Sequence, residues 1–146
     1  MFITLITPNN EENADISIIE DEACGSIITR IKYKGKDICG YSKGGTLPEA
    51  FAEMQKQLPE DIIIKSCLTC RHGNTCPFNS CDDEFFCTKD INITCKNDMC
   101  DLFCKESEGE MEKRLRYCTD SCEDFQQQSE DCYTYNVYLF FLNDLN

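Results

Sequence analysis

The sequence predicts an α+β fold, with a small antiparallel sheet, two helices and a cysteine-rich region dominated by loops. Three observations predict it. Short β-branched runs fill the first third of the chain, two stretches have the apolar spacing of helices, and 11 of the 13 cysteines follow residue 66. With 146 residues and 41% hydrophobic side chains, the chain is long enough to form a core. We therefore expect a single domain, 1–146, with a strand-rich part (1–66) and a cysteine-rich part (67–146).

The strand-rich part is predicted from short β-branched runs at 2–7, 16–19, 26–34, 37–42 and 61–65. The clearest run is 26–34, because every second residue on one face is suited to burial, as in a half-buried strand. These residues are Ile27, Thr29, Ile31 and Tyr33. The turn from Lys34 to Asp37 should join this strand to the next one as a hairpin.

A first helix is predicted over 47–58, between signals that start and stop a helix. Thr46 and Glu49 have the spacing of a capping box, and Pro48 fits the first turn, where its missing N–H costs nothing. Pro59 should end the helix. The apolar residues of one face are Leu47, Phe51, Met54 and Leu58.

The cysteine-rich part is predicted to hold little regular structure over 67–104, so cross-links by metal or sulfur should hold it together. A second helix is expected over 108–128, and a final strand over the aromatic and β-branched tail 133–142. The helix would place five side chains on one face, namely Met111, Leu115, Cys118, Cys122 and Phe125.

The charge of the chain excludes some classes of partner. The net charge is −13, and residues 67–146 carry 7 basic against 16 acidic side chains. Such a surface repels phosphate backbones and anionic lipids, and no run approaches the ~18 apolar residues that span a membrane. We therefore expect no nucleic acid and no membrane as partner, and a basic protein as the partner.

The cysteines bear on the cellular compartment. A density of 13 in 146 residues is typical of secreted disulfide-rich proteins. The odd count leaves at least one thiol without an intrachain partner, and the first residues lack the features of a signal peptide. We therefore expect a reducing, cytoplasmic location. The alternative is an exported protein whose N-terminal signal has been removed.

Four cysteines have the spacing of ligands for a metal or cluster. Cys67, Cys70, Cys87 and Cys100 form C-x2-C-x16-C-x12-C, and Phe103 lies three residues after the last of them. This pattern resembles the cluster-ligand spacing of high-potential iron–sulfur proteins over residues 67–103. The resemblance implies that these four cysteines hold a [4Fe–4S] cluster.

A C-x2-C turn supplies two thiolate ligands for a soft metal from one backbone knuckle. Zinc is the metal we prefer for this region, because it needs no additional chemistry and would simply hold the loop together. Cys67 and Cys70 could also combine with Cys100 and Cys104, as the two short-spaced pairs of a zinc ribbon do. Four protein ligands leave no open position for a substrate, so such a site would be structural.

A second and weaker set of possible ligands comprises Cys104, Cys118, Cys122 and Cys132. Cys118 and Cys122 are four residues apart on the predicted helix, a spacing that suits co-ligation better than a disulfide. Burial as small apolar side chains is the alternative for this pair. Disulfides remain the competing explanation for all of the cysteines.

Catalysis has little support in the sequence. The pair Cys67 and Cys70 follows a predicted strand, as in thioredoxin-like proteins, but Gly73 and Pro77 break the helix that such a redox site needs. His72 is the one histidine, and nothing identifies its partner in a dyad. No catalytic residues are therefore assigned, and an enzyme is the least supported class.

These features predict a small acidic binding protein with a structural thiolate metal site. It would act by protein–protein interaction with a basic partner, as immunity proteins that neutralise basic toxins do. Two alternatives stay open. One is a redox protein with a [4Fe–4S] cluster, and the other is an exported protein stapled by disulfides.

Overall fold

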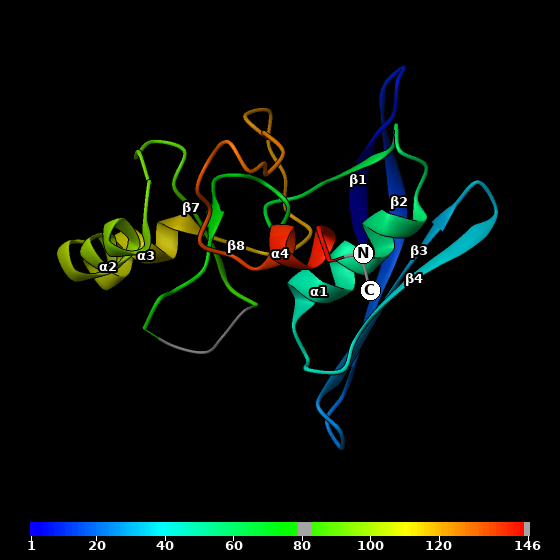
Figure 1. The fold of residues 1–146 in the computed structure, drawn as a ribbon, viewed down its shortest axis with the longest axis horizontal. Coiled ribbons are helices and arrows are strands. Elements are labelled where there is room, and N and C mark those ends of the chain that lie inside the picture. The colour runs from blue at the N-terminus through cyan, green and yellow to red at the C-terminus, as the bar shows by residue number, and fades with distance from the viewer. Residues whose placement is uncertain (79–82, 145–146) are drawn as a thin grey trace. The chain divides into compact units, whose positions relative to one another are not determined.

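The computed structural model describes residues 1–78 and 83–144, which form a mixed α+β fold, as predicted (Figure 1). A curled antiparallel sheet of five strands, a second sheet of three short strands and four helices make up this part of the chain. None of these helices has the length and apolar character needed to cross a membrane. The chain divides into two compact units, here called unit 1 (Met1–Lys65 with Val137–Asn146) and unit 2 (Ser66–Asn136).

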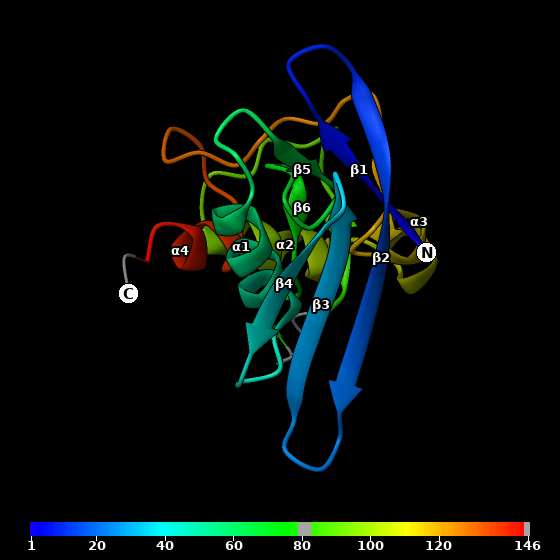
Figure 2. The same ribbon diagram turned by 90° about the vertical axis from the view of Figure 1, so that its right-hand side faces the viewer.

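Unit 1 is built on the five-stranded sheet, in which neighbouring strands are antiparallel and the order is β4-β3-β2-β1-β5 (Figure 2). All five predicted strands are present. They are β1 (Phe2–Ile6), β2 (Glu11–Asp21), β3 (Ser26–Tyr33), β4 (Lys36–Ser42) and β5 (Ile63–Lys65).

Strand β2 is longer than its apolar residues predict. Its polar first half pairs with β1, from Phe2↔Asp15 to Ile6↔Glu11, and its second half pairs with β3. Backbone hydrogen bonds to two neighbours therefore extend it through residues with low strand propensity. The alternation predicted for β3 is confirmed, since its four inward side chains are buried.

Helix α1 (Leu47–Gln57) begins and ends where predicted, but the capping box is wrong. The Thr46 side chain makes no cap hydrogen bond. Instead, the Ser42 hydroxyl donates to the Glu49 carboxylate over 2.7 Å and accepts the Thr46 backbone N–H over 2.9 Å. Because β4 ends beside the helix start, a serine from the strand replaces the threonine as partner.

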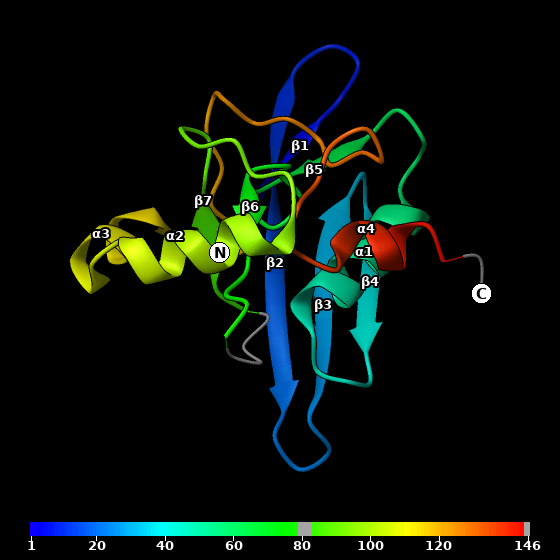
Figure 3. The same ribbon diagram turned by 60° about the vertical axis from the view of Figure 1, so that its left-hand side comes forward.

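The final strand predicted over 133–142 is wrong, because this segment contains helix α4 (Tyr138–Leu142). Helix α4 lies beside α1, and α1 contacts β3 and β4, so both helices belong to one helical layer of unit 1 (Figure 3). Among the aromatic residues that suggested a strand, Tyr138 is 1% exposed in this layer, whereas Phe140 is 71% exposed. Tertiary contacts outweigh local propensity here.

Unit 2 holds the small antiparallel sheet, of order β6-β7-β8, and two helices. The elements are β6 (Gly73–Asn74), β7 (Phe85–Cys87), α2 (Lys96–Lys105), α3 (Glu108–Arg114) and β8 (Leu115–Arg116). Little regular structure was predicted over 67–104, and among the described residues of this range the regular elements are β6, β7 and most of α2. Met99 and Leu102 of α2 are buried with Phe86 and Met111 in a cluster that Phe103 also joins.

The second predicted helix starts correctly but ends at Arg114, so the prediction is wrong for 115–128. Ser107 caps α3 by accepting the Glu110 N–H. Beyond β8 the chain forms a loop, in which the Asp120 carboxylate accepts the Tyr117 N–H over 2.7 Å. Aspartate, serine and threonine offer the backbone such local alternatives to a helix. Cys118 and Cys122 therefore do not share a helix face.

Candidate functional site

The C-x2-C turn lies at the start of unit 2, directly after β5. Cys70 is 7% exposed and Cys67 is half-buried. The His72 backbone N–H points at the Cys70 sulfur, with the nitrogen 3.5 Å from Sγ, and the Gly73 N–H donates to the Cys70 carbonyl over 3.0 Å. The turn is therefore compact, and it presents two thiols from one short segment.

Cys87 is brought to this turn by the pairing of β6 with β7. Gly73 lies directly opposite Cys87 in the antiparallel register, and the Thr88 N–H donates to the His72 carbonyl over 3.0 Å. A β-carbon on Gly73 would clash with the carbonyl oxygen of Cys67. Glycine at this position thus allows the backbone of Cys67 to approach the strand pair.

Cys122 belongs to the loop 117–128, and this loop runs along the C-x2-C turn. The Cys67 N–H donates to the Asp120 carbonyl over 2.6 Å, and the Arg71 N–H donates to the Gln126 carbonyl over 2.7 Å. These two bonds hold the loop on both sides of Cys122.

An ion pair ties the same loop to the chain that follows β7. The ammonium of Lys89 lies 2.8 Å from the carboxylate of Asp124. Since Lys89 is two residues beyond Cys87 and Asp124 is two residues beyond Cys122, the pair holds these two cysteines near each other.

The electrostatics agree with this proximity. Burial, followed by the charges of the neighbouring Cys70, Asp120, Cys87 and Cys122, raises the pKa of Cys67 to about 12. The pKa of Cys70 is also raised, chiefly by burial, although hydrogen bonds from the backbone of Gln126 and His72 oppose the rise. Thiols this close repel as thiolates unless a cation joins them. We call Cys67, Cys70, Cys87 and Cys122 the thiol cluster.

The remaining cysteines predicted as ligands lie in several elements of unit 2. Cys100 and Cys104 belong to α2. Burial raises the pKa of Tyr133, and the charges of Tyr135, Cys95 and Cys100 add smaller contributions in the same direction. Cys118 lies in the loop after β8, where burial raises its pKa to about 11. Cys132 forms part of a turn and contacts Ser129. Cys81, another possible ligand, lies outside the described residues.

All 12 cysteines that the structure describes are free thiols. Within the same described residues, no group of three or more His, Cys, Asp or Glu side chains is arranged to hold a metal ion. The thiol cluster is thus a gathering of four cysteines by their backbones, and its sulfur atoms are not set at ligand spacing.

His72 lines a groove of about 290 Å³ in unit 2, together with Arg71, Cys132 and Tyr133. Burial, followed by the charge of Arg71, lowers the pKa of His72, so its imidazole is neutral near pH 7. Its backbone is fixed by Cys70 and Thr88, which makes His72 a residue that shapes the C-x2-C turn.

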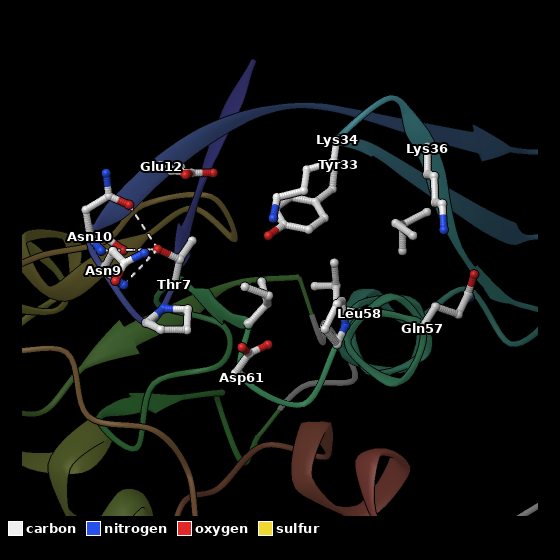
Figure 4. A pocket seen from close by; sticks show the side chains of 14 residues that line it. Thr7, Asn9, Asn10, Glu12, Tyr33, Lys34, Lys36, Gln57, Leu58 and Asp61 are labelled. Atoms are coloured by element: carbon white, nitrogen blue, oxygen red, sulfur yellow. Dashed lines mark hydrogen bonds between the residues drawn. The ribbon is translucent and has the colours of Figure 1, made fainter.

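Unit 1 has a larger pocket, of about 800 Å³, between the β1–β2 turn and the end of α1 (Figure 4). Thr7 hydrogen-bonds Asn10 on one side of it, and the Lys34 ammonium lies 5.3 Å from the centre of the Tyr33 ring. Its charges are mixed, because Lys34 and Lys36 line it together with Glu12 and Asp61. Such a lining selects no single class of charged ligand.

The outward face of the large sheet carries a row of exposed apolar side chains. Ile19 of β2 lies opposite Ile28 of β3, and Ile28 lies opposite Tyr41 of β4. They are 56%, 37% and 51% exposed, respectively, whereas the residues on either side of Ile28 in β3 and of Tyr41 in β4 are buried. We call these three residues the apolar ladder.

Acidic side chains lie beside the ladder, at the hairpin that joins β2 to β3 and projects at one end of the sheet (Figure 2). Glu20, Asp21 and Glu22 are all exposed there, and Lys43 follows β4. The basic residues Arg30 and Lys32 lie further along β3, where Lys32 is opposite Asp37. The hairpin end therefore combines an apolar row with a local excess of carboxylates.

Sequence reasoning did not predict the ladder or the place of Cys122 beside Cys67. The alternation of β2, β3 and β4 could have indicated the ladder, but only the register shows that the three side chains are neighbours. The run Thr119–Asp124, rich in helix-breaking polar residues, was the signal that Cys122 lies in a loop. Comparison with known protein families, curated proteins and solved structures found no match.

Proposed function

We propose that this chain is a small acidic binding protein that acts by protein–protein interaction with a basic partner, in the manner of an inhibitor or immunity protein. The observation that carries the proposal is the apolar ladder beside the carboxylates of the β2–β3 hairpin. Interfaces commonly combine an apolar centre with a polar rim, and tyrosine is enriched among the residues that dominate binding energy. Tyr41 is the proposed anchor.

The charge of the chain supports a basic partner. With a net charge of −13, the protein attracts cationic surfaces over distances near the Debye length, which is about 10 Å at 0.1 M salt. Complementary charge mainly raises the association rate and suppresses wrong partners. Binding should therefore weaken as salt is added, while the apolar ladder supplies the contacts that remain.

The second part of the proposal is a structural metal site in unit 2, with zinc as the metal and Cys67, Cys70 and Cys87 among its ligands. The sequence pattern names Cys100 as the fourth ligand, and a [4Fe–4S] cluster is the alternative occupant. The odd number of cysteines leaves at least one thiol without an intrachain partner, and we therefore propose a reducing compartment, the cytoplasm.

The binding surface can be tested with matched variants. The protein is immobilised and exposed to a lysate of the cells that make it, and retained proteins are identified by mass spectrometry at low and high salt. The double variant Ile19→Ser, Tyr41→Ser removes two ladder side chains. Tyr117→Ser is the control, because Tyr117 is 76% exposed and lies in unit 2, outside the ladder.

The proposal expects a basic protein that the wild type and Tyr117→Ser retain, that salt releases, and that the double variant fails to retain. Calorimetry with the purified partner should then give at least a tenfold loss of affinity for the double variant, which is about 1.4 kcal/mol. Equal binding by all three proteins, or a complex indifferent to salt, would place the contact elsewhere and refute the proposal.

A further inference from the structure

The fourth ligand of the metal site can be argued from the backbone of unit 2. Three segments meet at the C-x2-C turn, namely the turn itself, the strand pair β6–β7 and the loop 117–128. Each segment brings its cysteines to the same place through hydrogen bonds that do not involve sulfur, apart from the His72 contact to Cys70. The convergence is therefore a property of the fold.

The turn has features that a metal-binding knuckle requires. Cys67 and Cys70 are separated by two residues, and a backbone N–H points at the Cys70 sulfur. Hydrogen bonds from backbone N–H groups stabilise thiolate ligands and orient them toward the metal. Gln128 further holds the turn, because its side-chain amide donates to the Leu68 carbonyl over 3.0 Å.

The loop 117–128 places Cys122, and not Cys100, beside these thiols. It is hydrogen-bonded to the backbone N–H groups of Cys67 and Arg71, and the Lys89–Asp124 ion pair joins it to the chain after Cys87. Cys100 lies in α2, whose buried residues Met99 and Leu102 pack with Phe86 of β7 and Met111 of α3.

We propose that Cys67, Cys70, Cys87 and Cys122 together bind one Zn²⁺ ion, with Cys122 taking the place that the sequence pattern gives to Cys100. This inference rests on the metal site in the proposed function and is independent of the basic partner. Binding replaces four S–H protons by four Zn–S bonds, and the protons pass to solvent. The product carries two negative charges, which the Lys89 ammonium, close to Cys87 and Cys122, would offset.

The proposal requires the cysteine side chains to move when the ion binds. The four sulfur atoms are not at ligand spacing in the structure. A cysteine sulfur moves between staggered rotamers by rotation about one bond, and Cys122 is exposed and free to do so. With four protein ligands, the ion has no open position and would act as a structural staple of unit 2.

The test compares two single substitutions of unit 2 cysteines in the full chain. Wild type, Cys122→Ser and Cys100→Ser are expressed with added zinc, purified under reducing conditions and measured for zinc, iron and acid-labile sulfide. We expect about one zinc per chain in wild type and in Cys100→Ser. Cys122→Ser should lose most of its zinc or bind it at least tenfold more weakly against a competing chelator.

A third variant, Cys122→His, guards against the possibility that serine at this position prevents folding. Histidine is itself a zinc ligand, so this variant should keep the metal. With Co²⁺ in place of zinc, the visible absorption bands report the number of thiolate ligands. They should indicate four sulfur ligands in wild type, and three sulfurs with one nitrogen in Cys122→His.

The outcomes separate this inference from the function on which it rests. Wild-type protein without any metal would refute the metal site itself, and iron with sulfide would replace zinc by a cluster. Zinc that is lost in Cys100→Ser and retained in Cys122→Ser would refute Cys122 as the ligand and leave the metal site standing. A cobalt spectrum of Cys122→His that is the same as that of wild type would also refute Cys122 as a ligand.

Discussion

Gly73 shows how a single residue positions the thiol cluster. It pairs with Cys87 across the small sheet, and the backbone of Cys67 occupies the space where a side chain would begin. No rotamer can relieve that clash, because the obstructing atom belongs to the backbone. Because Gly73 has no side chain, the C-x2-C turn can pack directly against the strand pair that contains β7.

We predict that Gly73→Ala lowers the free energy of unfolding by about 1–3 kcal/mol, as other overpacking substitutions do. The matched control is Gly109→Ala in α3, where the new β-carbon would lie 4.0 Å from the Ser107 hydroxyl oxygen. The control should be neutral or should stabilise by up to about 1 kcal/mol, since alanine favours a helix. Urea unfolding followed by circular dichroism measures both. Equal effects of the two substitutions would contradict the close approach at Gly73.

Residue types alone predicted part of the candidate site. The C-x2-C spacing identified Cys67 and Cys70, because two thiols in one turn are close whatever the rest of the fold does. The position of Cys122 near Cys67 depends on hydrogen bonds between segments about fifty residues apart in the sequence. No local sequence pattern carries that information.

At the scale of elements, the sequence predicted well wherever one local signal dominates. The alternation in β3 and the proline-bounded apolar spacing of α1 gave correct elements, since burial of one face decides both. The prediction of one helix over 108–128 was wrong beyond Arg114. The apolar spacing continues past that residue, but the polar residues of 119–124 favour a loop. Helix α2 was missed, although Met99, Leu102 and Phe103 have helical spacing.

Asp98 shows how α2 begins. Its carboxylate accepts the backbone N–H and the hydroxyl of Thr94, both over 2.8 Å, and these bonds, the backbone one first, hold its pKa below the ordinary value of 3.8. A lowered pKa means that the charged form stabilises the folded state. That contribution is complete above the ordinary pKa and disappears as the pH falls through the lowered one.

We therefore predict that Asp98→Asn lowers the melting temperature at pH 7. The difference in melting temperature between the variant and wild type should become smaller as the pH falls below 3.8. Asp101→Asn, an exposed position in the same helix, is the control and should change little at any pH. Calorimetric melting of the three proteins, down to the lowest pH at which all remain folded, measures this difference. A constant difference would show that Asp98 does not act through its charge.

At the scale of the whole molecule, the two units have different sources of stability. Unit 1 has a five-stranded sheet with two helices in one layer, whereas the strands of unit 2 are two or three residues long. So short a sheet buries little, and the proposed zinc ion would supply folding free energy there.

Removal of zinc should consequently affect the two units unequally. After treatment with a chelator under reducing conditions, we predict that backbone amides of residues 66–136 lose protection from hydrogen exchange, while those of 1–65 keep it. Mass spectrometry of peptic fragments measures this, and added zinc should restore the protection. Equal loss in both units, or no loss in either, would argue against a staple confined to unit 2.

The return of the chain to unit 1 at Val137 has a consequence for synthesis on the ribosome. Helix α1 can contact α4 only after all of residues 66–136 have been translated, which takes roughly 4–14 s at 5–20 residues per second. During that interval the first 65 residues lack helix α4, and 11 cysteines leave the ribosome one after another. Chaperones and the supply of metal during translation would then decide how many chains reach the finished fold.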